Sequence, residues 1–391
     1  MARVWNKHKQ TNTPLKRKVF VGLSGGVDSA VSAALLKNEG HDVVGAFITI
    51  QIPGYPCPAA VDRRDAMRVA AHLRIPFIEV DLSKVYETQV LAETLQAFAR
   101  GETPNPDTLC NEKIKFGAFF DFCRAQGADY VATGHYARLQ KSLREGEMNG
   151  SPTPSRRDFV SPAELWAGVD PEKDQSYFLW QVPETALRHT LFPVGDKTKK
   201  EVRALARRFG LPNAERPDSQ GLCFLGPISM DDLLTEELNP EPGDVLDEAG
   251  AVVGLHRGVT LYTLGERHGF ELFATDPETP PHFVIAKDVT RNTITVSASR
   301  FPQGATKTVV LLANTNWIGD GPAGAVQARF RYRQKLIGAE LSFEDGHAVA
   351  TLNQPHYMAL GQSLVLYLPS VKTGQGNRCL GGGVIESATL K

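Results

Sequence analysis

The first half of the chain alternates short apolar runs with longer runs whose apolar residues recur at helical spacing. Because strands that alternate with helices pair in parallel, this pattern predicts an α/β domain in which helices cover both faces of a doubly wound parallel sheet. The expected strands are 18–23, 42–50, 76–82 and 128–135, and the expected helices are 29–40, 60–75, 111–127 and one that ends at about Arg100.

The pattern changes in the second half. Helical runs are expected near 174–189 and 198–209, but after about Arg216 glycines recur between short alternating runs. From about Ala305 onward, runs such as "TVVLLANTNWI" and "GQSLVLYL" are typical of the strands of a β-barrel. The expected domains are a flexible basic leader over 1–17, the α/β domain over 18–215, a small α+β domain over 216–300 and a β-barrel over 301–391.

Composition and charge exclude few function classes. A chain of 391 residues is too long for one ordinary domain, and 42% apolar with 22% charged residues is normal for a globular protein. The net charge of −1 does not indicate nucleic-acid binding, nor does it exclude a local basic face. No apolar run is long enough for a membrane span, so we expect no membrane contact.

The N-terminal stretch "MARVWNKHKQTNTPLKRK" is basic and lacks the apolar centre of a secretory signal. We interpret it as a frayed leader, and a transit peptide or an RNA-contacting arm are the alternatives. The chain has 5 cysteines, with no C-x-x-C pair, which argues against a disulfide framework and against a structural zinc site. A reducing cytoplasm fits this usage, and a reactive cysteine there is more often catalytic or redox-active than structural.

The most specific motif is "GLSGGVDSA", from Gly22 to Ala30, between the first expected strand and the first expected helix. Glycines allow close approach of an anion, and the helix N-terminus stabilises its charge. The run lacks the lysine of a P-loop and does not match G-x-G-x-x-G. It is similar to the pyrophosphate loop of ATP pyrophosphatases, which cleave ATP between the α and β phosphates. The alternative is an ordinary glycine turn with a serine cap.

"NPDTLCNEK" places Cys110 after a proline-stiffened turn and directly before an expected helix. A helix N-terminus lowers a thiol pKa and favours the nucleophilic thiolate, so we expect Cys110 to be partly exposed and reactive. Asp107 lies three residues earlier and could be a plain turn or cap residue. Taken alone, Cys110 could equally be a small buried apolar residue.

A second thiol, Cys223, lies in the polar, glycine-containing stretch "RPDSQGLCFLG". It could meet Cys110 only through folding or loop closure. Two separated thiols suit sulfur transfer, because one can carry a persulfide while the other resolves it as a disulfide. We expect Cys123 and Cys379 to pack in the core, and Cys57, between two prolines, to be an incidental residue. For Cys223 too, an incidental loop cysteine is the alternative.

Together these motifs resemble the tRNA-specific 2-thiouridylase family, whose members thiolate the wobble uridine of tRNA. The matching runs cover about residues 18 to 387 in the family's order: "GLSGGVDSA", "TPNPDTLCNEKIKF", "ATGHYAR", "KDQSYFL", "LFPVG", "DSQGLCFLG", "TLGERHG", "RYRQ", "GQS" and "CLGGGVIE". One short run could match by chance, but this ordered set does not.

The resemblance implies a fold like that of the adenine nucleotide alpha hydrolases, with ATP bound at Gly22, Leu23, Ser24, Gly25, Gly26, Val27, Asp28 and Ser29, and with Ile48 and Gly134 lining the nucleotide site. It implies that Asp28 acts through Mg²⁺ on the pyrophosphate, that Cys223 carries the persulfide and that Cys110 is the nucleophile. It also makes Asp107 the candidate general acid/base. The uridine at position 34 would be adenylated and then receive the sulfur, with release of pyrophosphate and AMP. Whether the sulfur leaves as hydrosulfide or through a Cys110–Cys223 disulfide stays open.

The resemblance also implies partners: tRNA, and a persulfide donor such as a cysteine desulfurase or a sulfur-relay protein. The residues that match tRNA-contacting positions are Asn105, Pro106, Asp107, His135, Lys173, Asp174, Gln175, Arg331, Tyr332 and Gln362. Each also has a plain interpretation, such as a turn cap for His135, a helix cap for Asp174 or a solvated strand face at 329–335. The basic run 196–208 is either a solvated helix face or a phosphate contact, and we favour the contact.

Two other functions are compatible with parts of the sequence. Another ATP pyrophosphatase, such as an amidotransferase-type synthetase, would leave both cysteines and the β-rich half without a role. An RNA- or nucleotide-binding protein that has lost catalysis would be expected to lack one of Cys110, Cys223 or the glycine run, and all three are present.

Overall fold

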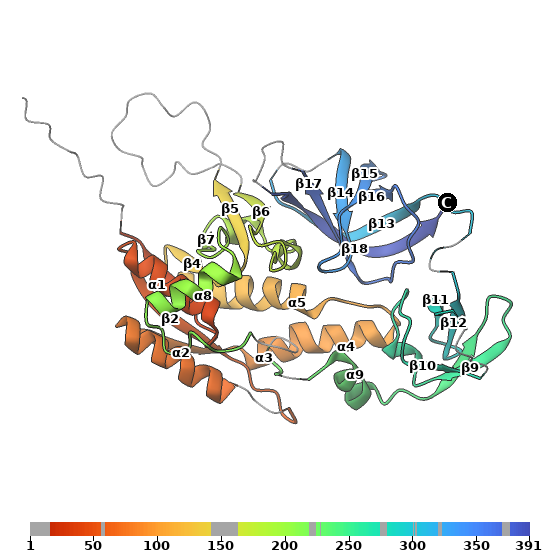
Figure 1. Cartoon of the computed structure of the whole chain (residues 1–391), viewed down its shortest axis with the longest axis horizontal. Coiled ribbons are helices and arrows are strands. Elements are labelled where there is room, and N and C mark those ends of the chain that lie inside the picture. The colour runs from red at the N-terminus through yellow and green to blue at the C-terminus, as the bar shows by residue number, and fades with distance from the viewer. Residues whose placement is uncertain are drawn as a thin grey trace, which may run out of the picture.

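The computed structural model describes residues 16–55, 59–141, 163–218, 224–226, 228–273, 280–299, 301, 303–319, 323–369 and 376–391. Figure 1 shows a parallel sheet with its helices on one side of the molecule, a barrel on the other side and a small sheet beneath the barrel. None of the helices in these ranges is long and apolar enough to cross a bilayer.

The parallel sheet has the strand order β3-β2-β1-β4-β7, which confirms the expected doubly wound α/β fold. One face of the sheet packs on three amphipathic helices, because Val19 and Val21 of β1 join one apolar cluster with residues of those helices, whereas Phe20 belongs to the cluster on the opposite face. The strands are β1 (Lys18–Gly22), β2 (Asp42–Thr49), β3 (Phe77–Asp81), β4 (Tyr130–Ala132) and β7 (Thr190–Leu191), and the three helices are α1 (Val27–Asn38), α2 (Ala59–Leu73) and α8 (Lys199–Arg208).

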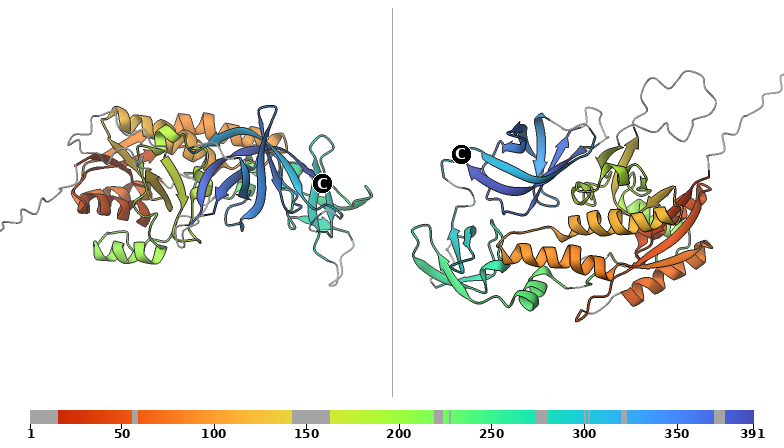
Figure 2. Two further views of the ribbon diagram at one scale, coloured as in Figure 1. Left: turned by 90° about the horizontal axis from the view of Figure 1, so that it is seen from above. Right: turned by 180° about the vertical axis from the view of Figure 1, so that it is seen from behind.

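Two long helical segments cover the opposite face and run side by side from the parallel sheet towards the small sheet, as the two views in Figures 1 and 2 show. Both contain π-helical turns, which often occur at functional sites. The second bends at Gly117, whose φ and ψ are both −105°. The first consists of α3 (Ser83–Tyr86), η1 (Glu87–Leu91) and α4 (Ala92–Ala99), and the second of α5 (Pro106–Leu109), η2 (Cys110–Ala118) and α6 (Phe119–Ala125).

The helical run expected over 174–189 is wrong as a single helix. The structure has a 3-10 turn, η3 (Ser176–Leu179), and a four-residue helix, α7 (Glu184–Leu187). Pro183 precedes α7 with an extended ψ of 141°, so the chain leaves the helical conformation between the two pieces.

The small sheet has the order β10-β9-β8-β12-β11 and its own apolar core around Val245, Tyr262 and Val284. Helix α9 (Met230–Leu238) leads into it and packs on α4 and on the 3-10 turn η4 (Val259–Leu261). The strands are β8 (Gly243–Leu246), β9 (Val252–His256), β10 (Phe270–Leu272), β11 (Phe283–Asp288) and β12 (Thr293–Ser297).

The C-terminal strands form a closed barrel, because β13 pairs both with β16 and with β18. A hairpin of β5 (Ala137–Lys141) and β6 (Ala163–Ala167), which belongs to the first half of the chain, extends the barrel sheet at β18. The sequence pattern did not predict this hairpin. The barrel strands are β13 (Thr308–Trp317), β14 (Gly324–Arg329), β15 (Ile337–Glu344), β16 (His347–Leu352), β17 (Ser363–Leu368) and β18 (Arg378–Leu390).

Candidate functional site

The glycine run forms the turn between β1 and α1, at the carboxyl edge of the parallel sheet where such folds bind ligands. Gly26 is the N-cap of α1 and no side chain caps this helix end. Its backbone N–H groups are therefore available to an anion. The two serines shape the turn instead: the Ser24 N–H donates to Ser29 Oγ at 3.2 Å, and Ser29 Oγ donates to the Gly26 carbonyl at 3.2 Å.

Two residues that the sequence did not predict to belong to the site stabilise this turn. Asn213 donates from Nδ2 to the carbonyls of Gly25 and Gly26 at 2.7 and 3.1 Å. The Arg216 guanidinium pairs with Asp62 and with Asp65 of α2. Gly25 has a φ of +76°, and a Cβ there would lie 2.5 Å from the Asp62 carbonyl oxygen, so only glycine fits.

Asp28 lies in the first turn of α1, where its carboxylate is 30% exposed. The Tyr136 hydroxyl donates to Oδ1 at 2.8 Å, and Lys199 Nζ lies 2.8 and 2.9 Å from the two carboxylate oxygens. Burial, together with the charge of Asp28, raises the pKa of Tyr136, so this phenol stays a donor. Lys199 comes from the start of α8, and no sequence motif linked it to the loop.

Ile48 and Gly134 both lie at the same edge of the sheet as the glycine turn. Ile48 pairs with Val80 near the end of β2, beside the strand that leads into the turn. Gly134 follows β4, and a Cβ there would lie 2.7 Å from the Ser29 N–H nitrogen, which explains why no side chain is tolerated. Their predicted place around one nucleotide is therefore compatible with the fold.

The helix that carries Cys110 begins earlier than expected. Asn105 is its N-cap, and its side chain accepts hydrogen bonds from the N–H groups of Asp107 and Thr108 at 3.1 and 3.3 Å. Pro106 occupies the first helical position, where a missing N–H costs nothing. Cys110 thus lies beyond the first turn rather than ahead of the helix, and it is 0% exposed, so the prediction of a partly exposed thiol at the helix N-terminus is wrong.

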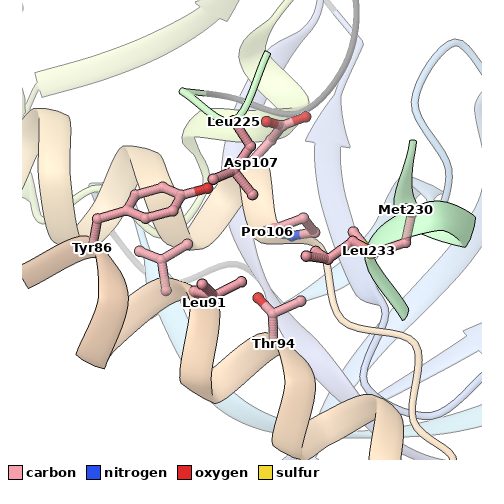
Figure 3. A pocket seen from close by; sticks show the side chains of 9 residues that line it. Tyr86, Leu91, Thr94, Pro106, Asp107, Leu225, Met230 and Leu233 are labelled. Carbon is pink, nitrogen blue, oxygen red and sulfur yellow. The ribbon is translucent and has the colours of Figure 1, made fainter. Parts of the chain in front are cut away.

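Asp107 faces a small cavity between the two long helical segments and α9. Figure 3 shows Tyr86, Leu91 and Thr94 on one side of this cavity, Pro106 and Asp107 on another, and Leu225, Met230 and Leu233 closing it. Its volume of about 10 Å³ has room for roughly one water molecule. Burial raises the pKa of Asp107 above its usual value, against the opposing charge of Lys115, as suits a general acid.

The segment just before Asn105 lies where the three parts of the molecule meet. The Thr103 N–H donates to the Leu360 carbonyl of the barrel part at 2.7 Å, and Thr103 Oγ1 lies 3.5 Å from Thr263 Oγ1 beside the small sheet. The helix start that positions Asp107 is thereby fixed by both β domains.

The three residues of the "KDQ" motif each bind a different part of the protein. Lys173 pairs with Asp218 at 2.8 Å. Asp174 is buried and pairs with Arg329 of β14 at 2.8 Å. Gln175 accepts from the N–H of Tyr136 at 3.0 Å, and Tyr136 is the residue whose hydroxyl binds Asp28. A direct contact of Asp174 with tRNA would need this buried pair to open.

The remaining predicted tRNA contacts differ in exposure. His135 is buried between Phe116 and Phe192, and burial, together with the charge of Lys115, lowers its pKa well below the usual value, so its imidazole is neutral. Arg331 is exposed and donates to the Leu264 carbonyl at 2.6 Å. Tyr332 packs on Phe178 with ring centroids 4.6 Å apart. Gln362 Oε1 is buried and has no hydrogen-bond partner within the described part of the chain.

The basic faces of α8 are largely engaged within the protein. Lys199 and Arg203 point inward to Asp218, and Arg207 pairs with Glu215 at 2.7 Å. Lys200 and Arg208 are exposed. The phosphate contact favoured for this helix therefore stays a prediction for those two residues.

The site fits a nucleotide and a magnesium ion to different degrees. The glycine turn with its free helix N-terminus fits a pyrophosphate. Among the described residues no group of three His, Cys, Asp or Glu side chains could hold a metal by itself. A single carboxylate such as Asp28 suits Mg²⁺ that is bound mainly through phosphates and water.

Cys223 and Cys57 lie outside the described residues. Cys123 and Cys379 are each 0% exposed, which confirms the expectation that they pack in the core. Burial raises the pKa of both thiols to about 12, so neither is reactive.

The chain matches three protein-family models in succession. They are described as a tRNA methyl transferase HUP domain over residues 17–227, a tRNA methyl transferase PRC-barrel domain over 231–298 and an aminomethyltransferase beta-barrel domain over 307–385. These descriptions speak of methyl transfer, whereas the curated relatives that match over nearly the whole chain are named for thiolation.

One such relative is tRNA-specific 2-thiouridylase MnmA 2 of Aliarcobacter butzleri, which is 39% identical over 385 residues and matches 95% of this chain and 98% of its own. The enzyme named tRNA-specific 2-thiouridylase MnmA of Akkermansia muciniphila is 39% identical over 379 residues, covering 95% and 99% of the two chains. That of Paracidovorax citrulli is 38% identical over 388 residues, covering 95% and 97%. With this identity over nearly its whole length, and with the glycine turn and the Cys110 helix in place, the chain belongs to the tRNA-specific 2-thiouridylase family.

Proposed function

We propose that this protein is an ATP-dependent tRNA 2-thiouridylase that replaces the 2-oxygen of the wobble uridine, position 34, with sulfur. The observation that carries the proposal is the combination of two sites in one α/β domain. One is a glycine turn that leaves a helix N-terminus open beside Asp28, and the other is a helix start that presents Asp107 one turn before Cys110. The first suits cleavage of ATP, and the second suits substitution at a base.

The first step activates the base. The uracil 2-oxygen attacks the α-phosphorus of ATP, the bond to the β-phosphate breaks and pyrophosphate leaves, which turns a poor leaving group into AMP. The backbone N–H groups in the first turn of α1, which follows Gly26, stabilise the charge on the phosphates. Mg²⁺, held by Asp28 and the phosphates, would supply additional charge neutralisation at the pyrophosphate.

The second step delivers sulfur. The terminal sulfur of a Cys223 persulfide bonds to C2 and AMP departs, while Cys110 attacks Cys223 Sγ. The S–S bond of the persulfide breaks, a Cys110–Cys223 disulfide forms and a thiol reductant restores both residues. In the hydrosulfide route, Cys110 attacks Cys223 Sγ first and hydrosulfide leaves. The hydrosulfide then bonds to C2 and AMP departs. Asp107, whose pKa is raised by burial, is the proposed donor of a proton to the departing oxygen.

Access to this site requires movement. Cys110 is buried and the cavity beside Asp107 is too small for a pyrimidine, so Leu225 and its neighbours must part before a base enters. A base that reaches such a site must first leave the stack of the anticodon loop. The exposed Arg331 and the partly exposed Lys173 and Gln175 are the proposed first contacts with tRNA, whereas Asp174 is buried.

The proposed sulfur donor is a persulfide-carrying protein, such as a cysteine desulfurase or a relay protein, because free sulfide would not load Cys223 as a persulfide. The odd number of cysteines and the need for a reductant favour a reducing cytoplasm as the site of action.

A reconstitution tests the proposal. Purified protein with ATP, Mg²⁺, a persulfide donor and unmodified tRNA should yield 2-thiouridine and an equal amount of pyrophosphate. Cys110→Ser should abolish thiolation, and Cys123→Ser serves as its matched control. If no pyrophosphate appears with any tRNA, or if Cys110→Ser and Cys223→Ser both keep full activity, the mechanism is wrong. A methyl transfer would instead consume a methyl donor and leave ATP intact.

A further inference from the structure

One charged cluster joins the nucleotide turn to Asp218, which lies five residues before Cys223 in the sequence. Asp218 is the last described residue before 219–223. Three cations bind its carboxylate: Lys173 and Lys199 at 2.8 Å, and Arg203 at 2.9 Å. Lys199 is shared, because the same ammonium group also contacts the Asp28 carboxylate at 2.8 Å.

These contacts are strong enough to fix Asp218. Although burial alone would raise it, hydrogen bonds from Lys173 and Lys199 hold the pKa of Asp218 at about 2. The Lys199 side chain is 15% exposed, and its backbone N–H donates to Asp170 Oδ2 at 2.9 Å, which fixes the start of α8. The helix therefore holds the Lys199 ammonium group at the edge of the nucleotide turn. From there the group needs little movement to exchange a carboxylate for a phosphate.

The glycine turn has no lysine of its own, although other phosphate loops carry one in the motif. Lys199, 171 residues away from Asp28, is the cation that touches the carboxylate of this turn. A divalent ion on Asp28 would displace the ammonium group from that carboxylate, and the phosphates that accompany the ion would then be its nearest new anionic partners.

We propose that Asp218 is a positioning residue that competes with the pyrophosphate end of the nucleotide for Lys199, so that filling the nucleotide turn weakens the contacts that fix Asp218. This inference rests on the proposed use of ATP. Departure of pyrophosphate returns Lys199 to Asp218 and restores these contacts. Coupling of this kind is reciprocal. Asp218 weakens the binding of pyrophosphate by the same free energy by which bound pyrophosphate weakens the contact between Lys199 and Asp218.

Calorimetric titration with inorganic pyrophosphate and Mg²⁺ tests the competition without any turnover. Asp218→Asn keeps the shape of the side chain and removes its charge. It should bind Mg-pyrophosphate about five-fold more tightly than the wild type. This change lies near the lower end of the usual range for coupling between two sites, because Asp218 is 30% exposed and solvent screens its charge. Lys199→Met should bind it more weakly. Glu215→Gln is the matched control, since it removes one carboxylate from the same loop but one that pairs with Arg207, away from Lys199.

The double variant separates specific competition from a general change of charge. In the Lys199→Met background, Asp218→Asn should have no effect on pyrophosphate affinity. Hydrogen exchange of the peptide that ends at Asp218 should also rise when Mg-pyrophosphate saturates the wild type. Unchanged or weaker binding by Asp218→Asn, or equal tightening with and without Lys199, overturns the inference. If the wild type binds no Mg-pyrophosphate, it is the proposed nucleotide site that fails.

Discussion

The buried ion pair between Asp174 and Arg329 gives a prediction that separates a structural role from direct RNA contact. The two side chains are 5% and 9% exposed and lie 2.8 Å apart, and the guanidinium also lies 4.6 Å from the centre of the Tyr367 ring. Arg329→Met keeps much of the side-chain volume but leaves a buried carboxylate without its cation. Removing one partner of a buried pair costs about 3–5 kcal/mol.

The lower end of this range, about 3 kcal/mol, is expected because the Asp174 carboxylate still accepts hydrogen bonds from the N–H groups of Gly168 and Ser176, both at 3.1 Å. The assay is urea unfolding followed by tryptophan fluorescence, with Arg378→Met as the matched control. Arg378 also joins the barrel to the β5–β6 hairpin, through Glu164 at 2.8 Å, but this pair is 32% and 24% exposed and should be worth less than about 1 kcal/mol. If the two variants unfold at the same urea concentration, the reasoning is refuted.

Three further predictions concern the site itself. Asn105→Ala removes the helix cap and should destabilise the protein by about 1 kcal/mol, whereas Asn105→Asp should keep most of that stability when both are measured by thermal unfolding. Asp107→Asn should abolish thiolation yet raise the melting temperature at neutral pH. The folded-state pKa of Asp107 is raised, so its charge destabilises the fold above that pKa; the gain should vanish below about pH 4, its unfolded value, and a gain that persists there would contradict the assignment. Gly25→Ala should lose pyrophosphate binding, while Gly40→Ala, at a similar positive φ but in open space, should keep it in the same titration.

The parts of the fold that the sequence predicted are those in which local pattern and final environment agree. The central residues of β1 and β2 are apolar because both faces of the sheet are covered, and the glycine turn between β1 and α1 has a specific backbone requirement at Gly25. Cys123 and Cys379 lie among apolar neighbours in sequence and in space. In each case the residue types near in sequence already specify the surroundings.

The features that the sequence did not predict have a common physical origin, which is pairing between segments far apart in the chain. Nothing near Lys199 in sequence shows that it binds Asp28, and nothing near Asp174 shows that Arg329 will bury it. The hairpin of β5 and β6 is stabilised by β18, whose sequence lies at the far end of the chain. The expectation that Cys110 precedes the helix is wrong because proline, which is typical of turns, is equally suited to the first position of a helix capped by Asn105.

The most direct test of the proposed function is the nucleoside composition of tRNA from cells that lack this protein. Liquid chromatography with mass spectrometry should show that 2-thiouridine and its derivatives at position 34 disappear, that the wild-type gene restores them and that the Cys110→Ser gene does not. If the amount of 2-thiouridine is unchanged in the deletion strain, or is restored fully by Cys110→Ser, this protein is not the thiolating enzyme that its fold and its site indicate.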